Sequence, residues 1–561
     1  MEEVPHAGIN RISDLNDDIL HLIFERFDLQ PASDSTTTTQ TRKDLLSAAK
    51  TCKAFVEPAL NSLWRVLPSL SPLLLLLPSA KVINNHYVSL RLSLYLSYHL
   101  TSSYFIKFVD RLPLNNWERF DIHAPRVRSL YLEPFRMVIS PHVYLRIRSL
   151  RPRDTPLLPG LKEIYIPDHL NTSLDFSSAA LLLASDSSFN LINLDDGATS
   201  DPQFCIPFLC QLSANSPSLT HLALCGTVNM SLDLDLVLRF RNLQCLDLKL
   251  SGTYLGSQFL QDLGKLDNLL DLTLDTTSPI EGFEGPTTRP TNSTFIKLKK
   301  LHILGTPNSI SRVLEDMHVL TNLTTLLIHE KKVEFGRNTE STESSWKRCF
   351  AIISTFSAIE NIQVTQFERS PWTSHYRLST SCFYPLYKLN NVTSFVIENG
   401  SLSGSDEDFR FLACAFPKMR KFVEPCAEYR EGRTLACLPH FSQANRHLRE
   451  LKISLATLDI SENLKAINVI GRPIIQDHQH PLEELHIASN FGSLTLLDMI
   501  QVAQFLDLIF PNLSTLKAYD GSEDSTWTKI QQIRKALQDA RIKASSATKI
   551  SNEQDEHGIL P

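Results

Sequence analysis

One phrase recurs along most of the sequence and limits the possible folds more than any other feature. In each copy, an apolar residue is followed by two variable residues, a second apolar residue, one variable residue and a third apolar residue. Successive copies start between 24 residues (Leu219 to Leu243) and 36 residues (Leu323 to Ile359) apart. The end of each copy has the two-residue period of a short strand, so two apolar side chains share one face. One such strand cannot bury that face alone, whereas a stack of repeats can.

Segments between the copies carry apolar residues at helical spacing, so each repeat reads as strand, turn and helix. We predict an α/β fold: a solenoid with short parallel strands inside the curve and helices outside. An ordinary α/β domain, whose parallel strands are also apolar, is the alternative. The copies start at Val127, Leu161, Phe189, Leu219, Leu243, Leu269, Leu298, Leu323, Ile359, Val392, Met419, Leu448, Leu482 and Leu513. Helical spacing is seen in Ile310, Val313, Leu314, Met317 and Leu320, and again in Leu497, Ile500, Phe505 and Ile509.

These repeats resemble the leucine-rich repeat. The phrase "LEELHIASN", which begins at Leu482, is nearest to the family's LxxLxLxxN form, and the resemblance covers roughly residues 124–521. The copies at Ile359, Met419 and Leu513 depart most from the form, because Glu424 and Ala518 stand where an aliphatic residue is expected. The sequence leaves the register of these three copies open.

The N-terminal segment predicts three short helices. In "ISDLNDDILHLIFERFDL", apolar residues from Ile19 to Phe27 follow a capping residue at helical spacing. The polar stretch from Gln30 to Asp44 predicts a loop or a disordered insert, because its Ser/Thr run cannot form a core. Two further helices follow in "LLSAAKTCKAFVEPALNSLWR", the second of which has Pro58 in its first turn. About fifty residues form a marginal core by themselves.

These helices resemble an F-box. Leu15, Ile19 and Leu20 match the family's opening Leu-Pro-x-Glu-Ile-Leu, with Asn16 and Asp18 in place of its proline and glutamate. The later segment matches at Cys52, Lys53, Phe55 and Trp64, and "NNWERFDIHAPRVRSLYL" is similar to the entry into the repeats of a group of fungal F-box proteins. By this resemblance the following residues form the F-box core or contact a Skp-type adaptor: Leu15, Ile19, Leu20, Ile23, Leu45, Leu46, Cys52, Phe55, Pro58, Leu60 and Trp64. The alternative is that the same side chains only cap the first repeat.

The resulting organisation has four parts. We assign residues 10–67 to the F-box, 68–123 to a helical connector and N-terminal cap, 124–525 to the leucine-rich repeats, and 526–561 to a C-terminal helix followed by a disordered tail.

Composition restricts the partners. A formal charge of -6 and a pI of 6.3 provide no general basic field for nucleic acid or an anionic membrane, and the five-leucine run after Pro72 is too short to span a bilayer. The acidic start "MEEVPHAGIN" lacks the apolar region of a signal peptide, so we expect the protein to be located in the cytoplasm or nucleus.

The cysteines and the Asn-x-Ser/Thr motifs do not indicate secretion. The sequence has ten cysteines and no CxxC pair, and we interpret them as reduced, mostly buried thiols. Asn-x-Ser/Thr motifs such as "NLT" are better explained by the repeat.

Catalytic motifs are missing from the sequence. There is no GxSxG, HExxH, GxxxxGK[ST] or GxGxxG, so we predict a noncatalytic protein without a cofactor. His478 and His480 in "DHQH" have the chemistry of metal ligands, but in a polar loop they are interpreted as solvated.

Residues between the strand leucines are displayed inside the curve and are the candidates for substrate binding. For each residue, simple exposure to solvent is the alternative. The candidates are His221, Asp247, Lys249, Asp271, Asp275, His302, His329, Lys452 and His486.

The F-box resemblance implies a function. In that family the F-box binds a Skp-type adaptor on a cullin scaffold, and the repeats present a protein substrate for ubiquitin transfer. The hypothesis is therefore a noncatalytic substrate receptor of such a ligase. A leucine-rich-repeat scaffold whose F-box-like helices only cap the solenoid is the second hypothesis, and an enzyme carried on the repeats is the third.

Overall fold

The computed structural model describes most of the chain, and every structural statement below concerns these residues. The described residues are 16–27, 29, 35–84, 104–108, 117–132, 137–139, 141–151, 156–166, 180, 183, 189–227, 233–253, 255–277, 295–317, 320–331, 342–366, 377–399, 401–424, 433–455, 480–488, 494–518 and 526–540. The chain folds into two compact units, Met1–Thr253 and Tyr254–Pro561.

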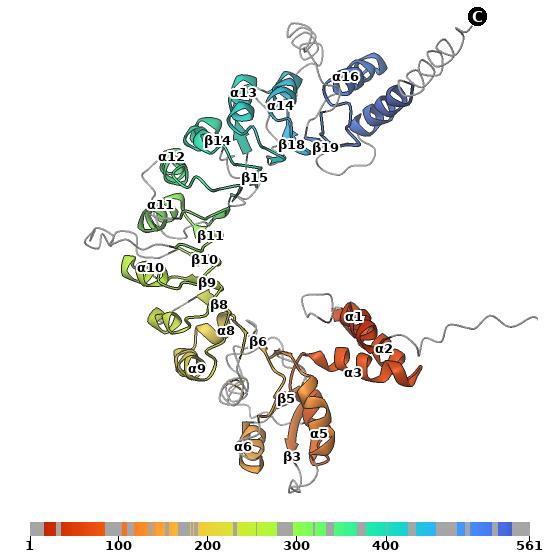
Figure 1. The fold of residues 1–561 in the computed structure, drawn as a ribbon, viewed down its shortest axis with the longest axis vertical. Helices are drawn as coiled ribbons and strands as arrows, with labels where there is room; N and C mark the ends of the chain where they lie inside the picture. Colours follow the sequence, from red (N-terminus) through yellow and green to blue (C-terminus); the bar gives the residue numbers. More distant parts are fainter. Residues whose placement is uncertain are drawn as a thin grey trace, which may run out of the picture. The chain divides into compact units, whose positions relative to one another are not determined.

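The first unit begins with helices and continues into a parallel sheet, in which the order of its strands is β1-β4-β6-β7-β8-β9 (Figure 1). Its helices are α1 (Asp17–Glu25), α2 (Ser35–Ala49), α3 (Lys53–Arg65), α4 (Ser71–Leu74), α5 (Glu118–His123), η2 (Ala124–Arg126), α6 (Pro141–Leu150), α8 (Asp196–Thr199), α9 (Pro202–Asn215) and η4 (Leu234–Arg239). Its strands are β1 (Val66–Leu67), β2 (Ala80–Asn84), β3 (Tyr104–Phe108), β4 (Ser129–Tyr131), β5 (Met137–Ile139), β6 (Glu163–Ile166), β7 (Leu191–Leu194), β8 (His221–Thr227) and β9 (Cys245–Ser251).

The second unit continues the same pattern, with the strand order β10-β11-β12-β13-β15-β17-β18-β19-β20. Its strands are β10 (Asp271–Asp275), β11 (Lys300–Gly305), β12 (Thr325–Glu330), β13 (Asn361–Thr365), β14 (Arg377–Ser379), β15 (Ser394–Glu398), β16 (Ser401–Ser403), β17 (Lys421–Val423), β18 (Glu450–Ser454), β19 (Glu484–Ala488) and β20 (Thr515–Ala518). Its helices are α10 (Ser257–Leu263), α11 (Pro307–Asp316), α12 (Thr342–Ile353), η5 (Thr380–Lys388), α13 (Asp406–Ala415), η6 (Leu435–Cys437), α14 (Leu438–Ala444) and α16 (Leu496–Ile509). Residues 526–540 form a final helix.

All fourteen copies of the recurring phrase form strands, and each strand starts at the third residue of its copy. Neighbouring strands pair in parallel and in register, so that Leu301 lies opposite Leu272 and Leu326. The apolar residues of the phrase are buried in both units. The predicted solenoid of short parallel strands is therefore confirmed.

Helices cover the other side of the strands. In the second unit, the helices α11 to α14 follow the outer side of the arc and the strands follow its inner side (Figure 1). Helix α11 begins at a capping box of Thr306 and Ser309 and buries Ile310 and Leu314, as its spacing predicts. Helix α16 differs from the prediction at Leu497, which is exposed, because this helix is apolar on more than one side.

Hydrogen bonds at the turns join successive repeats. In the "NLT" motif, the Asn322 amide donates to the carbonyl oxygen of Ile296 at 2.6 Å, and the Thr324 hydroxyl donates to that of Lys299 at 3.2 Å. The motifs at Asn391 and Asn512 make the same two bonds to the preceding repeat. These three motifs are therefore explained by the repeat.

Two local predictions in the first unit are wrong. The stretch predicted as a loop lies largely in α2, where Gln40 donates to Asp44 one turn later and Arg42 donates to the carbonyl oxygen of Val66 at 2.8 Å. Packing of α2 against α3 outweighs the low helix propensity of its Ser/Thr run. The connector is only partly helical, because β2 and β3 pair antiparallel within it.

The C-terminal helix is confirmed over residues 526–540, and the predicted disordered tail lies outside the described residues. Ile530 is buried, while Ile533 and Leu537 are half-buried. The Arg534 guanidinium group is also buried and donates to the carbonyl oxygen of Leu513, so this helix closes the last strand through a hydrogen bond as well as by apolar packing.

A buried ion pair replaces an aliphatic residue in the repeat that starts at Met419. Glu424 is fully buried and is paired with Arg433, whose side chain is also nearly fully buried. The Ser454 amide donates to Glu424 at 2.8 Å, and the Arg433 guanidinium group lies over the ring of Phe409 and donates to the carbonyl oxygen of Leu402. The carboxylate therefore has partners that compensate for its removal from water.

Replacing Glu424 alone should destabilise the second unit strongly. Glu424→Leu leaves the Arg433 cation buried without its partner, which is expected to cost about 3–5 kcal/mol of unfolding free energy. The double variant Glu424→Leu, Arg433→Leu removes both charges and should lose less than half as much. Urea denaturation of the three proteins measures this difference, and a single variant as stable as the wild type would contradict the assigned pair.

Candidate protein-interaction surfaces

Helix α1 presents an apolar side that the other described residues leave exposed, and we call it the α1 face. The Asn16 side chain accepts a hydrogen bond from the Asp18 amide at 3.1 Å, and acidic residues in the first turn complement the helix dipole. Leu20 and Phe24 point inward and are buried. Ile19, Leu22 and Ile23 on the other side form the α1 face, and their exposed fractions are 46%, 64% and 48%. Phe27, which follows the helix, is 39% exposed and stacks on Phe24.

The buried side of α1 belongs to a small core. Phe24, Leu29, Leu45 and Ala59 form its centre, and Phe55 packs against them. The rings of Phe24 and Phe55 meet edge to face at 5.4 Å between centroids. This core holds α1 in place while its opposite side remains exposed.

The structure separates the other residues of the F-box resemblance into core and surface. Leu45 and Pro58 are buried, Phe55, Leu60 and Trp64 are half-buried, and Leu15 lies outside the described residues. Cys52 is exposed at the start of α3, and Leu46 on α2 is 43% exposed. Leu22 was missed by the sequence analysis, although its position three residues after Ile19 is the signal that could have identified it.

The C-terminal end of α3 contacts the segment that leads into the repeats. The Trp64 ring stacks on His123 with 4.5 Å between centroids. Arg126 forms an ion pair with Glu57 at 2.8 Å and donates to Asn61 at 2.5 Å. Burial, followed by the nearby Arg126 charge, lowers the pKa of His123, so the stacked ring is neutral near pH 7. Trp64 therefore packs on the segment that leads into the first repeat, as expected if α3 caps the solenoid.

The strand candidates lie on the side of the sheet opposite the leucine core. His221 is exposed, whereas Asp247, Lys249, Asp271, His302, His329, Lys452 and His486 are partly exposed. In the second unit, register places His302 beside Thr273, and Lys452 beside His486. Many of these side chains are paired: Lys249 with Asp247 at 2.7 Å, Lys300 with Asp271 at 3.0 Å, and Lys452 with Glu450 at 3.1 Å.

Two histidines on this surface, His329 and His486, are neutral near pH 7. Burial, with Lys331 as the second cause, lowers the pKa of His329. Burial and Lys452 lower the pKa of His486 in the same way. For Lys249, burial is the largest single effect and favours the neutral amine, but the hydrogen bond and charge of Asp247, together with nearby Cys225 and Asp195, outweigh it and raise the pKa.

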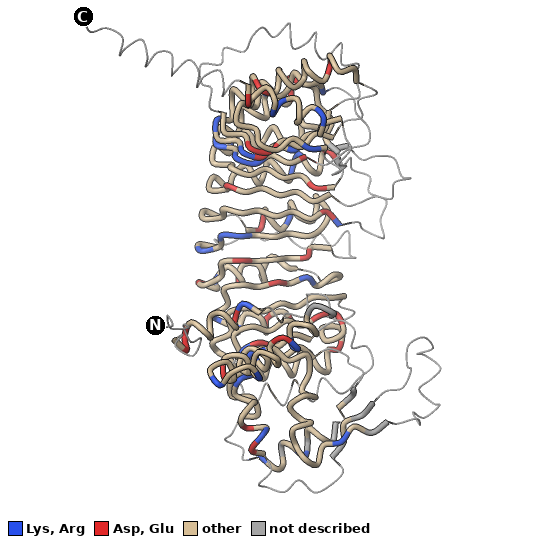
Figure 2. Tube along the Cα trace, turned by 90° about the vertical axis from the view of Figure 1, so that its right-hand side faces the viewer, with Lys and Arg blue, Asp and Glu red and all other residues tan. Residues whose placement is uncertain are grey.

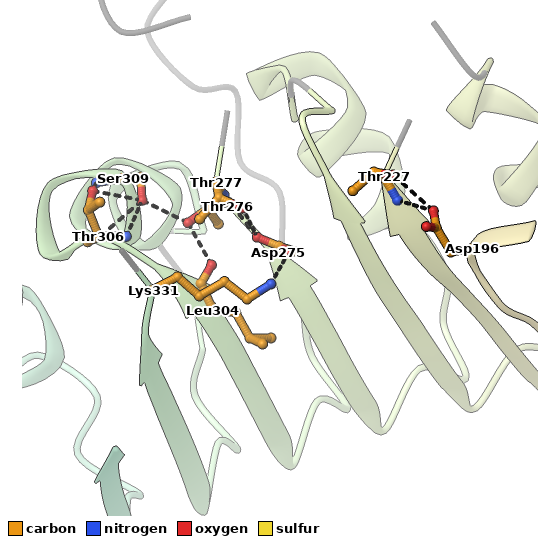
Figure 3. A network of polar contacts seen from close by, with 9 residues as sticks. All are labelled: Asp196, Thr227, Asp275, Thr276, Thr277, Leu304, Thr306, Ser309 and Lys331. Carbon is orange, nitrogen blue, oxygen red and sulfur yellow. Dashed lines mark hydrogen bonds and ion pairs between the residues drawn. The ribbon is translucent and has the colours of Figure 1, made fainter. Parts of the chain in front are cut away.

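Asp275 is a correction to the predicted surface, because its carboxylate is buried. Figure 3 shows its contacts with Lys331 and Thr277. Lys331 donates to it at 2.5 Å, and the amide and hydroxyl of Thr277 donate at 2.9 Å and 2.5 Å. Burial would raise the pKa of Asp275, but these bonds outweigh it and hold the pKa below its ordinary value. The carboxylate serves the fold at the end of β10.

A second set of hydrogen bonds lies next to Asp275, where β10 and β11 end, and is also drawn in Figure 3. The Thr276 hydroxyl donates to the carbonyl oxygen of Leu304 at 2.9 Å and lies 2.8 Å from the Ser309 hydroxyl. Gly305 has a φ of 156°, and a Cβ atom there would lie 2.0 Å from the Thr276 hydroxyl. These contacts fix the turn from β11 into α11.

Neither metal ligands nor activated thiols form a site in the described part of the chain. No group of three or more His, Cys, Asp or Glu side chains is arranged there to hold a metal ion. His480 is buried rather than solvated and contacts the carbonyl oxygen of Asn445 at 3.1 Å, while Asp477 and His478 lie outside the described residues.

Of the nine described cysteines, four are buried, three are half-buried and two are exposed. Burial raises the pKa of Cys349 to about 12, so it is a protonated thiol.

The architecture is that of a leucine-rich-repeat solenoid with a small helical N-terminal region. No family model and no curated protein matches the sequence. Solved structures that it resembles include an internalin from Listeria monocytogenes, with 10% identity, 65% of this chain and 82% of that chain covered, and a TM-score of 0.28. The corresponding values are 11%, 79%, 70% and 0.30 for the LRIM1/APL1C complex, and 13%, 72%, 48% and 0.35 for a TLR13–ssRNA13 complex.

Among the helices of the described ranges, none is both long enough and apolar enough to cross a membrane.

Replacement of Asp275 should cost stability in a pH-dependent way. Asp275→Asn leaves Lys331 and Thr277 without the carboxylate and should lower the unfolding free energy by about 1–3 kcal/mol at pH 7. Because the folded pKa is depressed, this contribution is present above the ordinary Asp pKa of about 3.9 and is lost as the pH falls through the folded value. Urea denaturation midpoints at neutral and acidic pH check the effect.

The matched control is Asp271→Asn, which breaks the more exposed pair with Lys300 and should change stability by less than about 1 kcal/mol. Equal losses for the two variants, or an Asp275 effect that grows as the pH falls, would contradict the assignment.

Proposed function

We propose that this protein is the substrate-recognition subunit of a Skp/cullin/F-box type ubiquitin ligase. The observation that carries the proposal is the α1 face, an apolar helix surface that the other described residues leave exposed. Contiguous exposed apolar surface on a folded protein commonly marks a binding site. In this proposal α1 to α3 bind a Skp-type adaptor, and through it a cullin.

Burial of apolar surface would drive this association. Covering the α1 face with a partner yields roughly 25 cal/mol per Å² before the costs of association are subtracted. Ile19 and Ile23 are one helical turn apart and Leu22 lies between them, which is the spacing of helix-in-groove recognition. The buried core around Phe24 holds the three residues in place before binding.

The repeats then supply the substrate-binding part. Side chains between the strand leucines are displayed in rows on neighbouring repeats, which is how solenoids build extended binding surfaces. In this reading the protein is noncatalytic, acts in the cytoplasm or nucleus, and leaves ubiquitin transfer to other subunits of the complex.

A scaffold role is the second candidate, and one observation favours it. Trp64 and Arg126 join α3 to the segment that enters the repeats, which is expected of helices that cap a solenoid. This contact uses the C-terminal part of α3, whereas the α1 face is formed by other residues. Capping and adaptor binding are therefore compatible.

A pull-down of purified Skp-type adaptor with the full chain tests the proposal. Wild-type protein should recover the adaptor, and Ile19→Glu, Ile23→Glu should reduce recovery at least about tenfold, because two charges replace apolar contacts. Both side chains are exposed, so the variant should melt at the same temperature as the wild type. Addition of a cullin to the pull-down distinguishes the ligase from the scaffold.

Helix α16 offers a matched control, since Leu496 and Leu497 are 66% and 64% exposed. Leu496→Glu, Leu497→Glu introduces the same two charges and should leave adaptor recovery unchanged. The proposal is wrong if the wild type recovers no adaptor, or if wild type and both variants recover it equally.

A further inference from the structure

Two neighbouring repeats carry arginines at the same position, immediately before their strands. Arg420 precedes β17 and Arg449 precedes β18, and the Arg449 amide donates to the carbonyl oxygen of Arg420 at 2.7 Å. Parallel strands lie about 4.8 Å apart, so the two side chains start from adjacent points of one edge. Lys418, Arg446 and His447 lie in the turns that lead to the same edge.

These side chains are exposed, and the arginines have no ion-pair partner in the described part of the chain. Among the described residues, none of Arg420, Arg446 and Arg449 has a carboxylate within ion-pair distance. Lysines of the adjacent strands are different: Lys421 and Lys452 both bind Glu450, at 2.8 Å and 3.1 Å. The fold therefore neutralises the lysines and leaves the arginines available. Figure 2 shows Lys and Arg residues gathered at one edge of these repeats.

Like charges placed side by side on paired strands are destabilising. Arg420 and Arg449 therefore repel each other, and no carboxylate of the described residues forms an ion pair with either of them. A bound dianion between them would relieve it. Guanidinium groups also match phosphate oxygens in geometry, because each group donates two parallel hydrogen bonds.

Acidic residues limit the basic edge on both sides. In the same row of pre-strand positions, Glu360 lies two repeats before Arg420, and Glu483 directly follows Arg449, with its amide donating to the Arg449 carbonyl at 2.9 Å. Glu483 and Glu484 are both exposed. A long polyanion or a membrane surface would meet carboxylates at both ends of the row, whereas a short anionic segment placed between Arg420 and Arg449 avoids Glu360. The formal charge of -6 also disfavours a general polyanion partner.

We propose that the edge formed by Arg420, Arg446 and Arg449 binds a phosphorylated, acidic segment of a protein, with the phosphate held between Arg420 and Arg449. This proposal rests on the proposed function, because it names the class of substrate that the repeats would recruit. The phosphate site is tested without the adaptor, so a negative result for the site does not decide whether the protein binds the adaptor.

Peptide binding to the purified full-length protein tests the site. The probe is a fluorescent peptide pool with a fixed central phosphoserine between glutamates and random residues outside, and the same pool without phosphate is the reference. Fluorescence anisotropy should show tighter binding of the phosphorylated pool. Arg420→Ala, Arg449→Ala should weaken this binding at least about tenfold, as expected for loss of two charge-assisted contacts.

Lys297 and Lys299 provide the matched control, because they occupy the positions before β11 that Lys418 and Arg420 occupy before β17. Lys297→Ala, Lys299→Ala removes the same charge and should change affinity less than about twofold if the site is local. Equal weakening by both double variants would overturn the proposal, as would equal binding of the two pools. Tighter binding of a single-stranded RNA oligonucleotide than of the phosphorylated pool, or of anionic vesicles, would assign the edge to another class of ligand and would also overturn it.

Discussion

Aliphatic side chains of successive strands pack in rows, and each repeat buries its own pair only against the repeats beside it. Ile303 lies opposite Leu274 on one strand and Ile328 on the other, and all three are buried. Burial at roughly 25 cal/mol per Å² favours this register. A shift of one residue would turn every apolar side chain to the solvent side. The rest of the fold depends on this in-register stack, because it also decides which side chains remain outside.

Both proposed binding surfaces follow from the residues that the cores do not use. The N-terminal helices bury Phe24, Leu45 and Ala59 in one small core, and this leaves Ile19, Leu22 and Ile23 on the other side of α1. In the repeats, the register that buries the aliphatic rows brings Arg420 and Arg449 side by side before their strands. The first surface is apolar and the second is cationic, so they fit partners of different chemistry.

Much of the fold could be predicted from the sequence, because one short phrase carries both the strand period and the burial pattern. Features that depend on distant or non-periodic partners could not. Arg433, which compensates for Glu424 in the core, follows nine residues later without any repeating pattern to indicate the pair. Asp275 has the alternation of an outward residue, yet it lies at the end of its strand, where Lys331 from two strands further along reaches it.

The candidate site was predicted less completely, since helical periodicity identifies an apolar residue without saying whether it faces a core or a partner. Leu20 and Ile23 both fit the pattern, but only Leu20 is buried. The Ser/Thr run of α2 shows the opposite limit, because packing against α3 imposes a helix on residues with weak propensity for it.

The Asn-x-Ser/Thr motifs at Asn322, Asn391 and Asn512 form hydrogen bonds between repeats, which explains their presence without glycosylation. Each asparagine nitrogen already lies within 2.6 to 3.2 Å of a carbonyl oxygen in the preceding repeat. An oligosaccharide on that nitrogen would displace the carbonyl oxygen to which the nitrogen donates. Folding of these turns and glycosylation of these asparagines therefore compete, so a host that does not glycosylate is the better choice for producing the chain.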